Sequence, residues 1–473
     1  MTGPAPVPSL SELQAAIGRT PAWLVGGAVR DELLDRPLLD VDLAVGGDPM
    51  AAARAIGRAF GVPVFELSAD FGTWRAGGGD WHADVSVLQG ETIEDDLARR
   101  DLTVNAIARP LGGGAIVDPF GGLADLQSRL LRMVSPAAFE DDPLRMLRVP
   151  RLASELGFTI DAETERAVTA GAGRISRSAG ERVFTEIVRI LASGDAVRGV
   201  RMLDRLALLD AVIPELARLK AVEQNRYHHL DAFEHTVSVL ERAVEIEQDP
   251  AGMLPGLDAP DARAVAAHLR QPIADGVSRA TALRIGALLH DIAKPQTQAV
   301  ADDGTVLGFP NHAQEGVAVV GEICGRLRTS ERLRSHLGVL TRHHLGLGFL
   351  VHVHPLDKRA IYRYLRATGD AALDVSLLSV ADRLATRGHK AGESIARHLD
   401  VARQVLPAAV AWPEQAALAP LVRGDSLAAA LGIAPGPRLG ELLEAIAEAR
   451  YTGEIETAAQ AIEYARAYEP DTD

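Results

Sequence analysis

Two neighbouring stretches decide the fold of the N-terminal part of this chain. Residues 24–31 read Leu-Val-Gly-Gly-Ala-Val-Arg-Asp, and residues 39–42 read Leu-Asp-Val-Asp. The first stretch predicts a strand, a glycine turn and the start of a helix. Gly26 and Gly27 let the backbone come close to a phosphate, the helix start offers free N–H groups, and Arg30 adds a guanidinium for phosphate oxygens.

The second stretch places two carboxylates on one strand. Asp40 and Asp42 are two residues apart, so their side chains point to the same face. Carboxylates held this close repel each other, and divalent cations relieve that repulsion. Two hard cations held in this way can activate an attacking hydroxyl and bind a triphosphate. We therefore predict a catalytic Mg²⁺ site at Asp40 and Asp42, with Asp84 of the alternating stretch 81–85 as a third ligand.

The regions around these stretches alternate short β-rich and helical runs. From residue 123 onward, apolar residues recur at helical spacing almost to the end. The predicted fold class is therefore α+β, with a small N-terminal α/β head containing a mixed sheet, followed by an all-helical body. In the head, strands are predicted at 22–25, 41–45, 62–67, 81–88 and 115–117, and helices at 30–34, 48–60 and 95–108.

Proline and glycine mark boundaries along the helical body. Pro214 ends one helical block, 248–261 is typical of a surface loop, and 300–310 predicts a loop with a small hairpin at Asp303-Gly304. A further boundary falls in the Ala- and Pro-rich stretch 407–420. The predicted domains are the head at 1–121, a helical neck for base reading and RNA binding at 122–220, a metal-dependent domain at 221–400 and a C-terminal helical segment at 401–473.

Composition limits the class of protein. The chain has 473 residues, a single cysteine and a formal net charge of −15. One cysteine excludes an internal disulfide and favours a reducing cytoplasm, and neither a signal peptide nor an apolar run of membrane length is evident. The acidic balance argues against nucleic-acid binding. Residues 126–220, however, carry 15 Lys and Arg against 13 Asp and Glu, and a phosphate backbone needs only a local basic surface.

Two further motifs carry a family resemblance. Residues 99–106 read Arg-Arg-Asp-Leu-Thr-Val-Asn-Ala, and residues 141–148 read Asp-Asp-Pro-Leu-Arg-Met-Leu-Arg. Together with the glycine turn and the aspartate pair, they resemble the motifs of the bacterial-type (class II) tRNA nucleotidyltransferase and poly(A) polymerase family. The resemblance implies that the ribose and phosphates of the incoming nucleotide are bound by Arg99, Arg100, Asp101 and Asn105.

The third motif predicts how a base is chosen without a nucleic-acid template. On a helix, Asp142 and Arg145 are three residues apart and share a face. A carboxylate accepts a hydrogen bond from the cytosine N4 amine, and an arginine donates to ring acceptors. The family often has Glu-Asp where this chain has Asp141-Asp142, which leaves the reading pair intact. Arg148 and Arg151 continue the basic face of this helix.

The chain departs from the family between the strand of Asp84 and the Arg-Arg-Asp motif. Many members have a flexible charged loop there. In this chain Leu88 is followed by Gln-Gly-Glu-Thr and then by the acidic lead-in of the next helix, residues 93–96. Family members that stop after adding two cytidines lack the loop. We therefore hypothesise that the product is either the full C-C-A or only C-C.

A second set of side chains predicts a metal site in the helical body. In chain order these are His235, His290-Asp291, His312, His343-His344 and Asp382. Their order resembles the HD superfamily of metal-dependent phosphohydrolases, in which imidazoles and carboxylates from separate helices bind divalent ions that activate a water. Adjacent helical residues point about 100° apart, so only one of the pair His343-His344 faces the metal, and we favour His344. The spacing does not choose among Mg, Mn, Ni and Co. The other predicted ligands are His235, His290, Asp291, His312 and Asp382.

The resemblance implies a template-independent enzyme that adds nucleotides from CTP and ATP to the 3′ end of tRNA in the cytoplasm, with no membrane partner. Its HD domain is expected to hydrolyse 2′,3′-cyclic phosphates or phosphomonoesters, which would restore a 3′-hydroxyl for the head to extend. Two alternatives stay open. One is a poly(A) polymerase, which the lack of a basic tail disfavours, and the other is a phosphohydrolase whose head only binds nucleotide.

Overall fold

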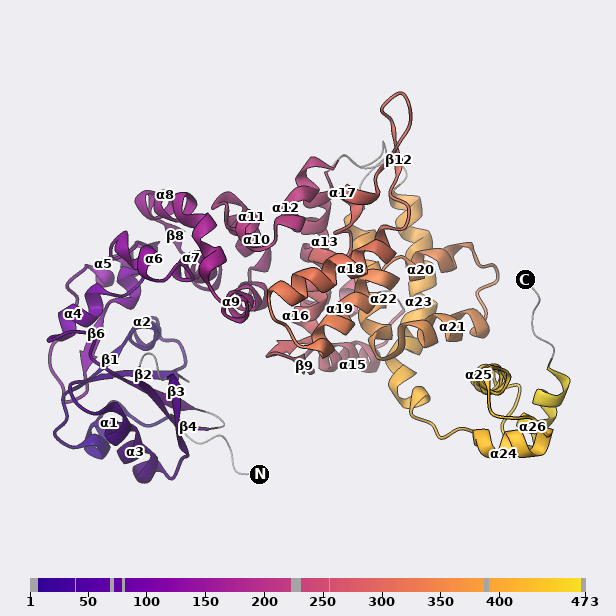
Figure 1. Ribbon diagram of the computed structural model, residues 1–473, viewed down its shortest axis with the longest axis horizontal. Coiled ribbons are helices and arrows are strands. Elements are labelled where there is room, and N and C mark those ends of the chain that lie inside the picture. The colour runs from indigo at the N-terminus through magenta and orange to yellow at the C-terminus, as the bar shows by residue number, and fades with distance from the viewer. Residues whose placement is uncertain are drawn as a thin grey trace. The chain divides into compact units, whose positions relative to one another are not determined.

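The computed structural model describes residues 7–38, 40–68, 72–78, 81–222, 231–254, 256–386 and 391–468 (Figure 1). The chain forms two compact units, Met1–Val212 and Ile213–Asp473. The division falls inside the stretch predicted as the neck, 122–220, so most of that stretch belongs to the same unit as the head. None of the described helices is long and apolar enough to cross a membrane.

The head is built on a six-stranded sheet with the strand order β3-β4-β5-β2-β1-β6. β2 and β5 run parallel, and the other neighbouring pairs run antiparallel. The predicted mixed sheet is therefore confirmed. The strands are β1 (Ala22–Val25), β2 (Asp40–Val45), β3 (Val64–Ser68), β4 (Thr73–Gly77), β5 (His82–Val87) and β6 (Ala108–Pro110).

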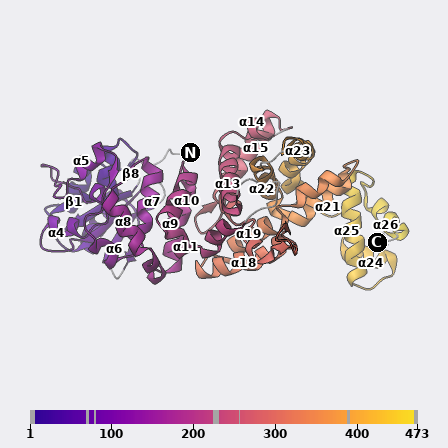
Figure 2. The ribbon, with the colours of Figure 1, turned by 90° about the horizontal axis from the view of Figure 1, so that it is seen from above.

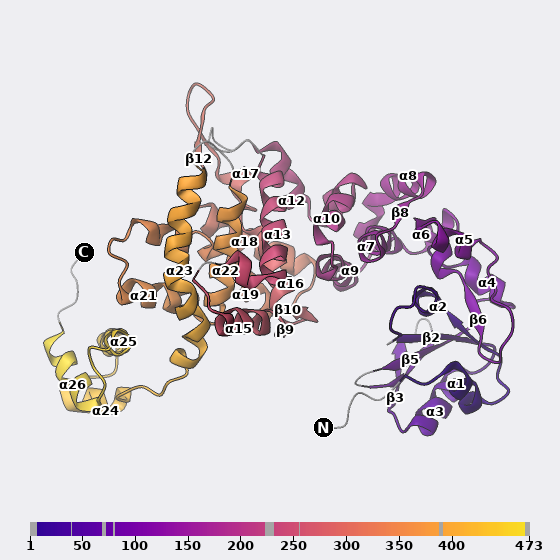
Figure 3. The same cartoon turned by 180° about the vertical axis from the view of Figure 1, so that it is seen from behind.

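The two faces of this sheet differ. α1 (Leu10–Ile17) and α3 (Pro49–Phe60) lie on one side of it, whereas α2 (Gly27–Leu33) lies on the other (Figure 3). β2 alternates accordingly, because its apolar side chains are buried while its carboxylates are at least partly exposed. Asp42 pairs with Asp84 in the parallel register, so both carboxylates lie on the face that α3 does not cover.

The predicted helix 95–108 is wrong. Over this stretch the structure has α4 (Ile93–Ala98), a 3-10 turn η1 (Thr103–Asn105) and the start of β6. The helix begins early because Thr92 forms a capping box with the third residue of the helix. At the far end, pairing of β6 with β1 overrides helix propensity.

Besides β6, the head elements α1 and β4 were not predicted, and one predicted strand is reduced. α1 begins at Ser9, whose side chain and that of Glu12 form a capping box. β4 forms because it pairs with both of its neighbours, β3 and β5, which its own sequence does not signal. The predicted strand 115–117 contributes only an isolated bridge to β6.

The rest of the first unit is helical apart from a ribbon of β7 (Leu130–Leu131) and β8 (Thr159–Ile160). The expectation that Asp142 and Arg145 share a helix is wrong. Asp142 has φ −138° and ψ 97° and ends α6, because a residue before proline avoids the helical region. The helices are α5 (Gly122–Gln127), α6 (Ala137–Asp141), α7 (Arg145–Leu156), α8 (Ala162–Gly171), α9 (Gly180–Ala192), α10 (Ala196–Arg205) and α11 (Leu208–Val212).

The second unit is a helical body around two helices, α16 and α22, that are buried along almost their whole length. α13, α19 and α23 pack against one or both of them (Figure 2). The helices of this body are α12 (Pro214–Ala217), α13 (Ala232–Gln248), α14 (Pro250–Met253), α15 (Ala259–Leu269), α16 (Arg279–Leu289), α17 (Lys294–Thr297), α18 (His312–Arg326), α19 (Glu331–His343), α20 (Gly346–Phe349), α21 (Lys358–Thr368), α22 (Ala372–Ala385) and α23 (Ala391–Ala416).

The last helices of the chain form a small group with an apolar core of its own. They are α24 (Gly424–Leu431), α25 (Pro437–Thr452) and α26 (Ala458–Ala467). α23 precedes them and runs through Pro407 and Pro413 before it ends at Ala416. The predicted boundary at 407–420 therefore coincides with the end of that helix, whereas the boundary expected at 400/401 falls inside it.

Other predictions for the body had mixed outcomes. The hairpin is confirmed, because β11 (Ala299–Val300) pairs with β12 (Val306–Gly308). A second ribbon, β9 (Pro272–Ala274) with β10 (Val277–Ser278), was not predicted. The block before Pro214 ends as predicted, with α11 finishing at Val212, and Pro214 also begins α12, since proline fits the first helical position. The predicted loop 248–261 contains α14 and the start of α15.

Candidate active site and metal centre

The predicted catalytic carboxylates lie together on the open face of the sheet. Asp42 and Asp84 are register partners on β2 and β5, and Asp40 Oδ1 lies 3.1 Å from His82 Nε2. Burial raises the pKa of Asp42 to about 6, and the charges of Asp84 and Asp40 add to this effect while Arg100 opposes it. A carboxylate crowded in this way is stabilised by a hard cation with a preference for oxygen ligands. The residues therefore fit a magnesium site.

Asp84 has a second partner that the sequence did not reveal. Both of its oxygens accept hydrogen bonds from Arg75 of β4, Oδ1 from Nε and Oδ2 from Nη2, each at 2.7 Å. The pair is bidentate and largely shielded from solvent. Of the three predicted catalytic carboxylates, Asp84 is the one that forms an ion pair with an arginine in the described structure. Asp40 and Asp42 form none with the described arginines.

The glycine turn brings an arginine to Asp42. Gly26 has φ +70°, and a Cβ at this position would lie 2.7 Å from Arg100 Nη1 and 3.6 Å from Asp42 Oδ2. A side chain there would displace the guanidinium, which explains why this position is glycine. Arg100 is held from the other side by Asp96, whose Oδ2 lies 2.8 Å from Nη2. A fixed positive charge therefore lies beside the catalytic carboxylates.

A chain of buried polar side chains continues from the turn toward the neck helices. Arg30 donates to Asn105 Oδ1 at 2.7 Å and to both oxygens of Asp31, and Asn105 donates to Asp101 Oδ1 at 3.0 Å. Arg148 Nη1 lies 3.1 Å from Asp101 Oδ2. Burial disfavours the charge of Asp101, but Arg148 and Asn105 outweigh it and lower its pKa to about 2. Asp101 is therefore an ionised acceptor fixed in place.

Glu186 of α9 anchors the two arginines at the far end of this chain. Its side chain is buried, and Oε2 lies 2.9 Å from Arg151 Nε while Oε1 lies 3.7 Å from Arg148 Nε. Glu155 is a weaker partner of Arg151, at 4.0 Å. Burial lowers the pKa of the Arg151 guanidinium, and Glu186 acts against that shift.

The predicted base-reading pair is held by neighbours on other elements. Asp142 Oδ2 accepts from Arg182 Nη2 at 2.9 Å, and Oδ1 accepts from the N–H of Leu144 at 3.2 Å. Arg145 Nη1 donates to the backbone carbonyl of Arg99 at 2.7 Å and to that of Ala138 at 3.3 Å. Tertiary contacts thus position the pair, although the two residues do not share a helix.

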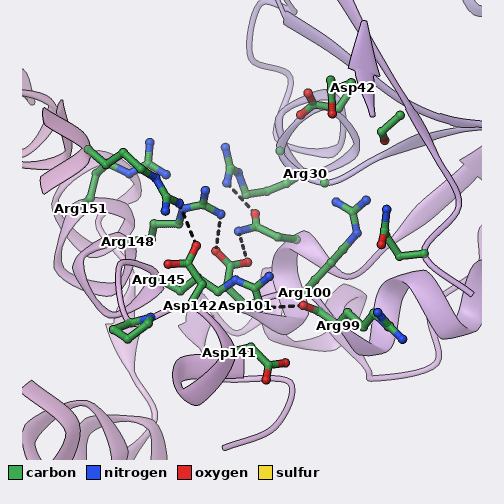
Figure 4. Close-up of a pocket in the computed structure, with 18 of the residues that line it drawn as sticks. Arg30, Asp42, Arg99, Arg100, Asp101, Asp141, Asp142, Arg145, Arg148 and Arg151 are labelled. Carbon is green, nitrogen blue, oxygen red and sulfur yellow. Dashed lines mark hydrogen bonds and ion pairs between the residues drawn. The ribbon is translucent and has the colours of Figure 1, made fainter. Parts of the chain in front are cut away.

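These side chains line one cavity of about 1420 Å³ within the first unit. Figure 4 shows Asp101 linked to Arg148 in the middle of the site, Arg100 on the side of Asp42, and Asp141 apart from the linked groups. Asp84 is the one predicted head residue that does not line the cavity. Those that do are Gly26, Gly27, Arg30, Asp40, Asp42, Arg99, Arg100, Asp101, Asn105, Asp142, Arg145, Arg148 and Arg151.

The connection between β5 and α4 is short and is held by hydrogen bonds. Leu88–Thr92 is all that separates β5 from α4. Gly90 has φ +145°, and a Cβ there would lie 2.3 Å from Cβ of Asp95. The N–H groups of Glu91 and Thr92 bond to Asp95, and that of Gln89 bonds to Asp96. A tight turn therefore stands where many relatives of this fold were expected to have a flexible loop.

The second unit brings the predicted HD residues together. Two groups among the described residues have all their ligand atoms within 4.8 Å of one another, namely His235 with His290 and Asp291, and Asp291 with His312 and His344. Asp291 joins the two groups. Asp382 extends the cluster, since its Oδ1 lies 3.0 Å from His235 Nε2. His343 is half-buried and lines a different cavity.

Three of these histidines are oriented by their own local backbone. Nδ1 of His290, His312 and His344 lies 2.9, 2.7 and 2.7 Å from the carbonyl oxygen three residues earlier. A ring that donates from Nδ1 keeps a lone pair on Nε2, the form that binds a metal. Nε2 of His312 and His344 lie only 3.3 Å apart, an approach that suits two ligands of one ion. Imidazole and carboxylate ligands of this kind fit a divalent transition metal or Mg²⁺.

The charges of this cluster also suit a cation. Burial works against the ionised form of Asp291, but His290 and Lys294 hold its pKa well below the usual range. Burial and the neighbouring His290 lower the pKa of His344 to about 4. Lys294 Nζ lies 2.6 Å from Asp291 Oδ2 and packs over the ring of Phe309. An ionised carboxylate and a neutral imidazole are the states in which Asp291 and His344 bind metal. Burial disfavours the charged form of His290, but Asp291 outweighs it and raises the pKa of His290, so a metal would compete with that proton.

Several residues of both sites were missed by sequence reasoning. Arg182 and Glu186 lie four residues apart on α9, so their shared face was a usable signal. Asp96 lies four residues before Arg100, so its spacing was a usable signal as well. Arg75 gave no signal, because its partner Asp84 is brought to it by strand pairing. Lys294 follows the His-Asp pair at helical spacing and could have been found.

The domain composition of the chain agrees with these two sites. Residues 22–80 and 78–132 match the Poly A polymerase head domain, residues 157–220 match the probable RNA and SrmB-binding site of polymerase A, and residues 232–387 match the HD domain. A head of this type joined to an HD domain defines the class of protein as a nucleotidyltransferase with a metal-binding helical body.

Full-length relatives narrow this class. The chain is 36% identical over 456 residues to the A-adding tRNA nucleotidyltransferase of Deinococcus radiodurans, covering 95% of this chain and 96% of that one. It is 33% identical to the CC-adding tRNA nucleotidyltransferase of Thermus thermophilus, covering 93% and 92%. The chain belongs to the bacterial tRNA nucleotidyltransferase family.

Solved structures share the fold. A CCA-adding enzyme in its apo form has a TM-score of 0.64 at 19% identity, covering 97% of this chain and 92% of that chain. The Thermotoga maritima CCA-adding enzyme complexed with tRNA has a TM-score of 0.59 at 19% identity, covering 97% and 93%.

Proposed function

We propose that this protein is a template-independent nucleotidyltransferase that extends the 3′ end of tRNA from CTP, from ATP or from both. One observation carries the proposal. Asp40 and Asp42 stand on the wall of a cavity whose other lining residues include arginines and a fixed carboxylate, Asp101. Carboxylates for metals on one side and cations for a triphosphate on the other are what in-line nucleotidyl transfer needs. The relatives supply the acceptor, since they are tRNA nucleotidyltransferases.

Each part of the cavity has a task in this mechanism. Mg²⁺, when bound by Asp40 and Asp42, would activate the attacking 3′-hydroxyl and neutralise the triphosphate, and Asp84 would join as a third ligand. Arg100, fixed beside Asp42, stabilises the negative charge of the phosphates. Asp101 accepts hydrogen bonds from ribose hydroxyls because it is ionised and immobile.

The remaining residues of the site give structural support and select the nucleotide. Arg99 and Arg30 complete the phosphate-binding set, with Gly26 and Gly27 allowing close approach. Asn105 accepts a hydrogen bond from Arg30 and donates one to Asp101, so it fixes these two side chains relative to each other. Arg148 and Arg151, held by Glu186, form the wall behind the ribose and base.

Selection of the base rests on Asp142 and Arg145. Their partners fix both side chains before a nucleotide arrives, so binding costs little conformational entropy. The carboxylate of Asp142 accepts from the N4 amine of cytosine, and Arg145 donates to the ring acceptors of the same edge. A uracil would present a carbonyl to Asp142 and lose that bond, which gives discrimination by protein side chains alone.

We infer that the product is C-C. The supporting observation is the pinned connection Leu88–Thr92, which leaves no loop to rearrange for a larger base. Addition of A is the second candidate, because the Deinococcus relative is A-adding. The experiment supplies tRNA without its C-C-A end and tRNA ending in C-C, each with CTP, with ATP and with both, and sequences the products.

The outcomes separate the candidates. Incorporation of two cytidines into the shorter tRNA, with no use of ATP on either substrate, supports C-C addition. Efficient addition of A to the C-C end with ATP alone, without incorporation of C, shows A addition in place of C-C addition. Addition of A together with incorporation of C shows full C-C-A addition. Failure to extend either tRNA under any condition rejects the nucleotidyltransferase function.

The second unit supports a second activity. We propose that His235, His290, Asp291, His312, His344 and Asp382 bind a divalent metal, Mg, Mn, Ni or Co, and that this site hydrolyses 2′,3′-cyclic phosphates or phosphomonoesters. The convergence of the Nε2 atoms on Asp291 carries the proposal. The test measures two reactions with each metal after chelation, namely opening of a 2′,3′-cyclic phosphate at an RNA end to the phosphomonoester, and release of phosphate from an RNA that ends in a phosphomonoester. The proposed tRNA substrate supports a cytoplasmic location, which we propose for this protein.

A further inference from the structure

Edge strand β3 exposes two large apolar side chains. Phe65 is 47% exposed and Leu67 is 44% exposed. The register shifts between Glu66 and Ser68, so Leu67 lies in a bulge next to Phe65 on the same edge strand. An exposed apolar pair on a strand at the edge of a sheet is unfavourable in water unless it binds something.

The register places Phe65 on the catalytic face of the sheet. Phe65 pairs with Arg75 of β4, Arg75 pairs with Asp84 of β5, and Asp84 pairs with Asp42 of β2. The four side chains therefore form one row across the sheet. Because adjacent strands lie about 4.8 Å apart, Phe65 is about 14 Å from Asp42.

The opposite face of the same strands is already filled. A Cβ on Gly57 of α3 would lie 2.3 Å from Val64, the neighbour of Phe65, and Arg54 of the same helix lies over the ring of Trp74, the neighbour of Arg75. Val64 and Trp74 thus serve the core, which leaves Phe65 and Arg75 facing outward on the side of the carboxylates.

The nucleotide cavity extends toward this edge. Thr73 of β4 and Ser86 of β5 line it together with Asp42. The groups for the incoming nucleotide come from the opposite end of the sheet, namely from the turn after β1 and from the segment that leads into β6. The side of the sheet formed by β5, β4 and β3 is therefore the side from which the acceptor strand can approach the carboxylates.

We propose that Phe65, Leu67 and Arg75 form a platform that binds the last nucleotides of the single-stranded RNA acceptor, with a base stacked on Phe65. This rests on the proposed tRNA substrate and adds where its 3′ end lies. An aromatic face accepts any base, which suits an enzyme that must extend many tRNAs. The guanidinium of Arg75, held flat against Asp84 through Nε and Nη2, offers a cation between the stacked base and the metals. Continuity with the catalytic row favours RNA over a protein partner.

The test uses the full-length protein and a tRNA lacking C-C-A whose last base is replaced by the fluorescent analogue 2-aminopurine. Stacking on Phe65 quenches this fluorophore in the wild-type complex. Phe65→Ala is expected to raise the KM for tRNA about tenfold, with the KM for CTP unchanged and the quenching lost. Phe65→Tyr keeps an aromatic face and is expected to retain both. Phe349→Ala, which removes an aromatic side chain that is 65% exposed in the second unit, is the matched control.

The possible results are separable. A Phe65→Ala variant with wild-type KM for tRNA and wild-type quenching overturns the platform while tRNA extension stands. Loss of activity in Phe65→Tyr as well as Phe65→Ala, with both melting below the wild type, shows a structural role and also overturns it. A wild-type protein that extends no tRNA removes the proposed function, and the platform with it.

Discussion

The two sites of this chain are built in opposite ways. The head site lies on the face of a sheet, and its carboxylates and arginines are neighbours in a few short motifs linked by ion pairs. The HD site draws its ligands from segments spread over residues 235–382, and four of its six proposed ligands are buried. The head is therefore arranged to receive a large charged substrate, whereas the HD site is arranged to enclose an ion. Variants that separate the two sites test this difference.

The largest effect is expected at Asp42. Asp42→Asn removes one of the two metal-binding charges on β2 and is expected to slow tRNA extension by about a thousandfold or more, since the charge of the transferred phosphate is no longer neutralised. Hydrolysis at the HD site should be unchanged, because the residue belongs to the other unit. Extension rates at saturating CTP, with phosphate release as the control, measure it. Equal loss of both activities would contradict the independence of the sites.

The reverse separation is expected at Asp291. Asp291→Asn removes the carboxylate shared by both ligand groups and leaves His290, His312 and His344 without their common partner. We expect loss of the bound divalent metal and at least a hundredfold loss of hydrolysis, because metal affinity falls 10–100-fold even for partners outside the ligand set. Metal content by atomic absorption gives a readout independent of activity. Retained metal at wild-type level would rule out the proposed ligand set.

A smaller effect is expected at Glu186, which holds Arg148 and Arg151 in the head site. Glu186→Gln removes the buried charge that faces Arg148 and Arg151. Breaking a buried ion pair costs about 3–5 kcal/mol, so the denaturation midpoint should fall, and the KM for CTP should rise 10- to 100-fold. Glu181→Gln, at the exposed start of the same helix, is the control. A lower stability with unchanged KM would mean that Glu186 supports the fold and not the nucleotide pocket.

The head site is also expected to respond to pH near 6. Because the pKa of Asp42 is raised to about 6, protonation below that pH removes the metal-binding form, and extension should fall about tenfold per pH unit. The same shift acts on stability in the other direction. Between 3.8 and about 6 the folded metal-free protein holds a proton that the unfolded chain has lost, so the free energy of unfolding falls as the pH rises through this window. Extension assays from pH 5 to 8 and melting curves without metal check the two signs.

The smallest effect is expected at His343. It adjoins His344 in sequence but lines another cavity, so His343→Ala should change metal content and hydrolysis less than about twofold. His344→Ala should lose the metal, because its Nε2 lies 3.8 Å from Asp291 Oδ1 and 3.3 Å from His312 Nε2. If the two variants behave alike, the assignment of the ligand to His344 fails.

The sequence by itself determined the features that depend on local periodicity and sterics. Strand alternation put Asp40 and Asp42 on one face, the pair Gly26-Gly27 marked the turn before a helix, and the helical runs set the layout of the second unit. Predictions from local sequence patterns failed where an adjacent residue or a paired strand sets the backbone conformation instead. Pro143 prevents Asp142 from sharing a helix with Arg145, and β6 interrupts the predicted helix 95–108 because it pairs with β1.

Only the tertiary structure decided which distant groups meet. Strand pairing sets Arg75 against Asp84 and aligns Phe65 with the catalytic row, which no spacing in the sequence could show. Each HD histidine is oriented by a carbonyl three residues away, but its convergence on Asp291 depends on how separate helices pack. The physical reason is the same in both units. Local geometry is fixed by the covalent chain within a few residues, whereas a site is closed by burial and pairing between segments that the chain leaves far apart.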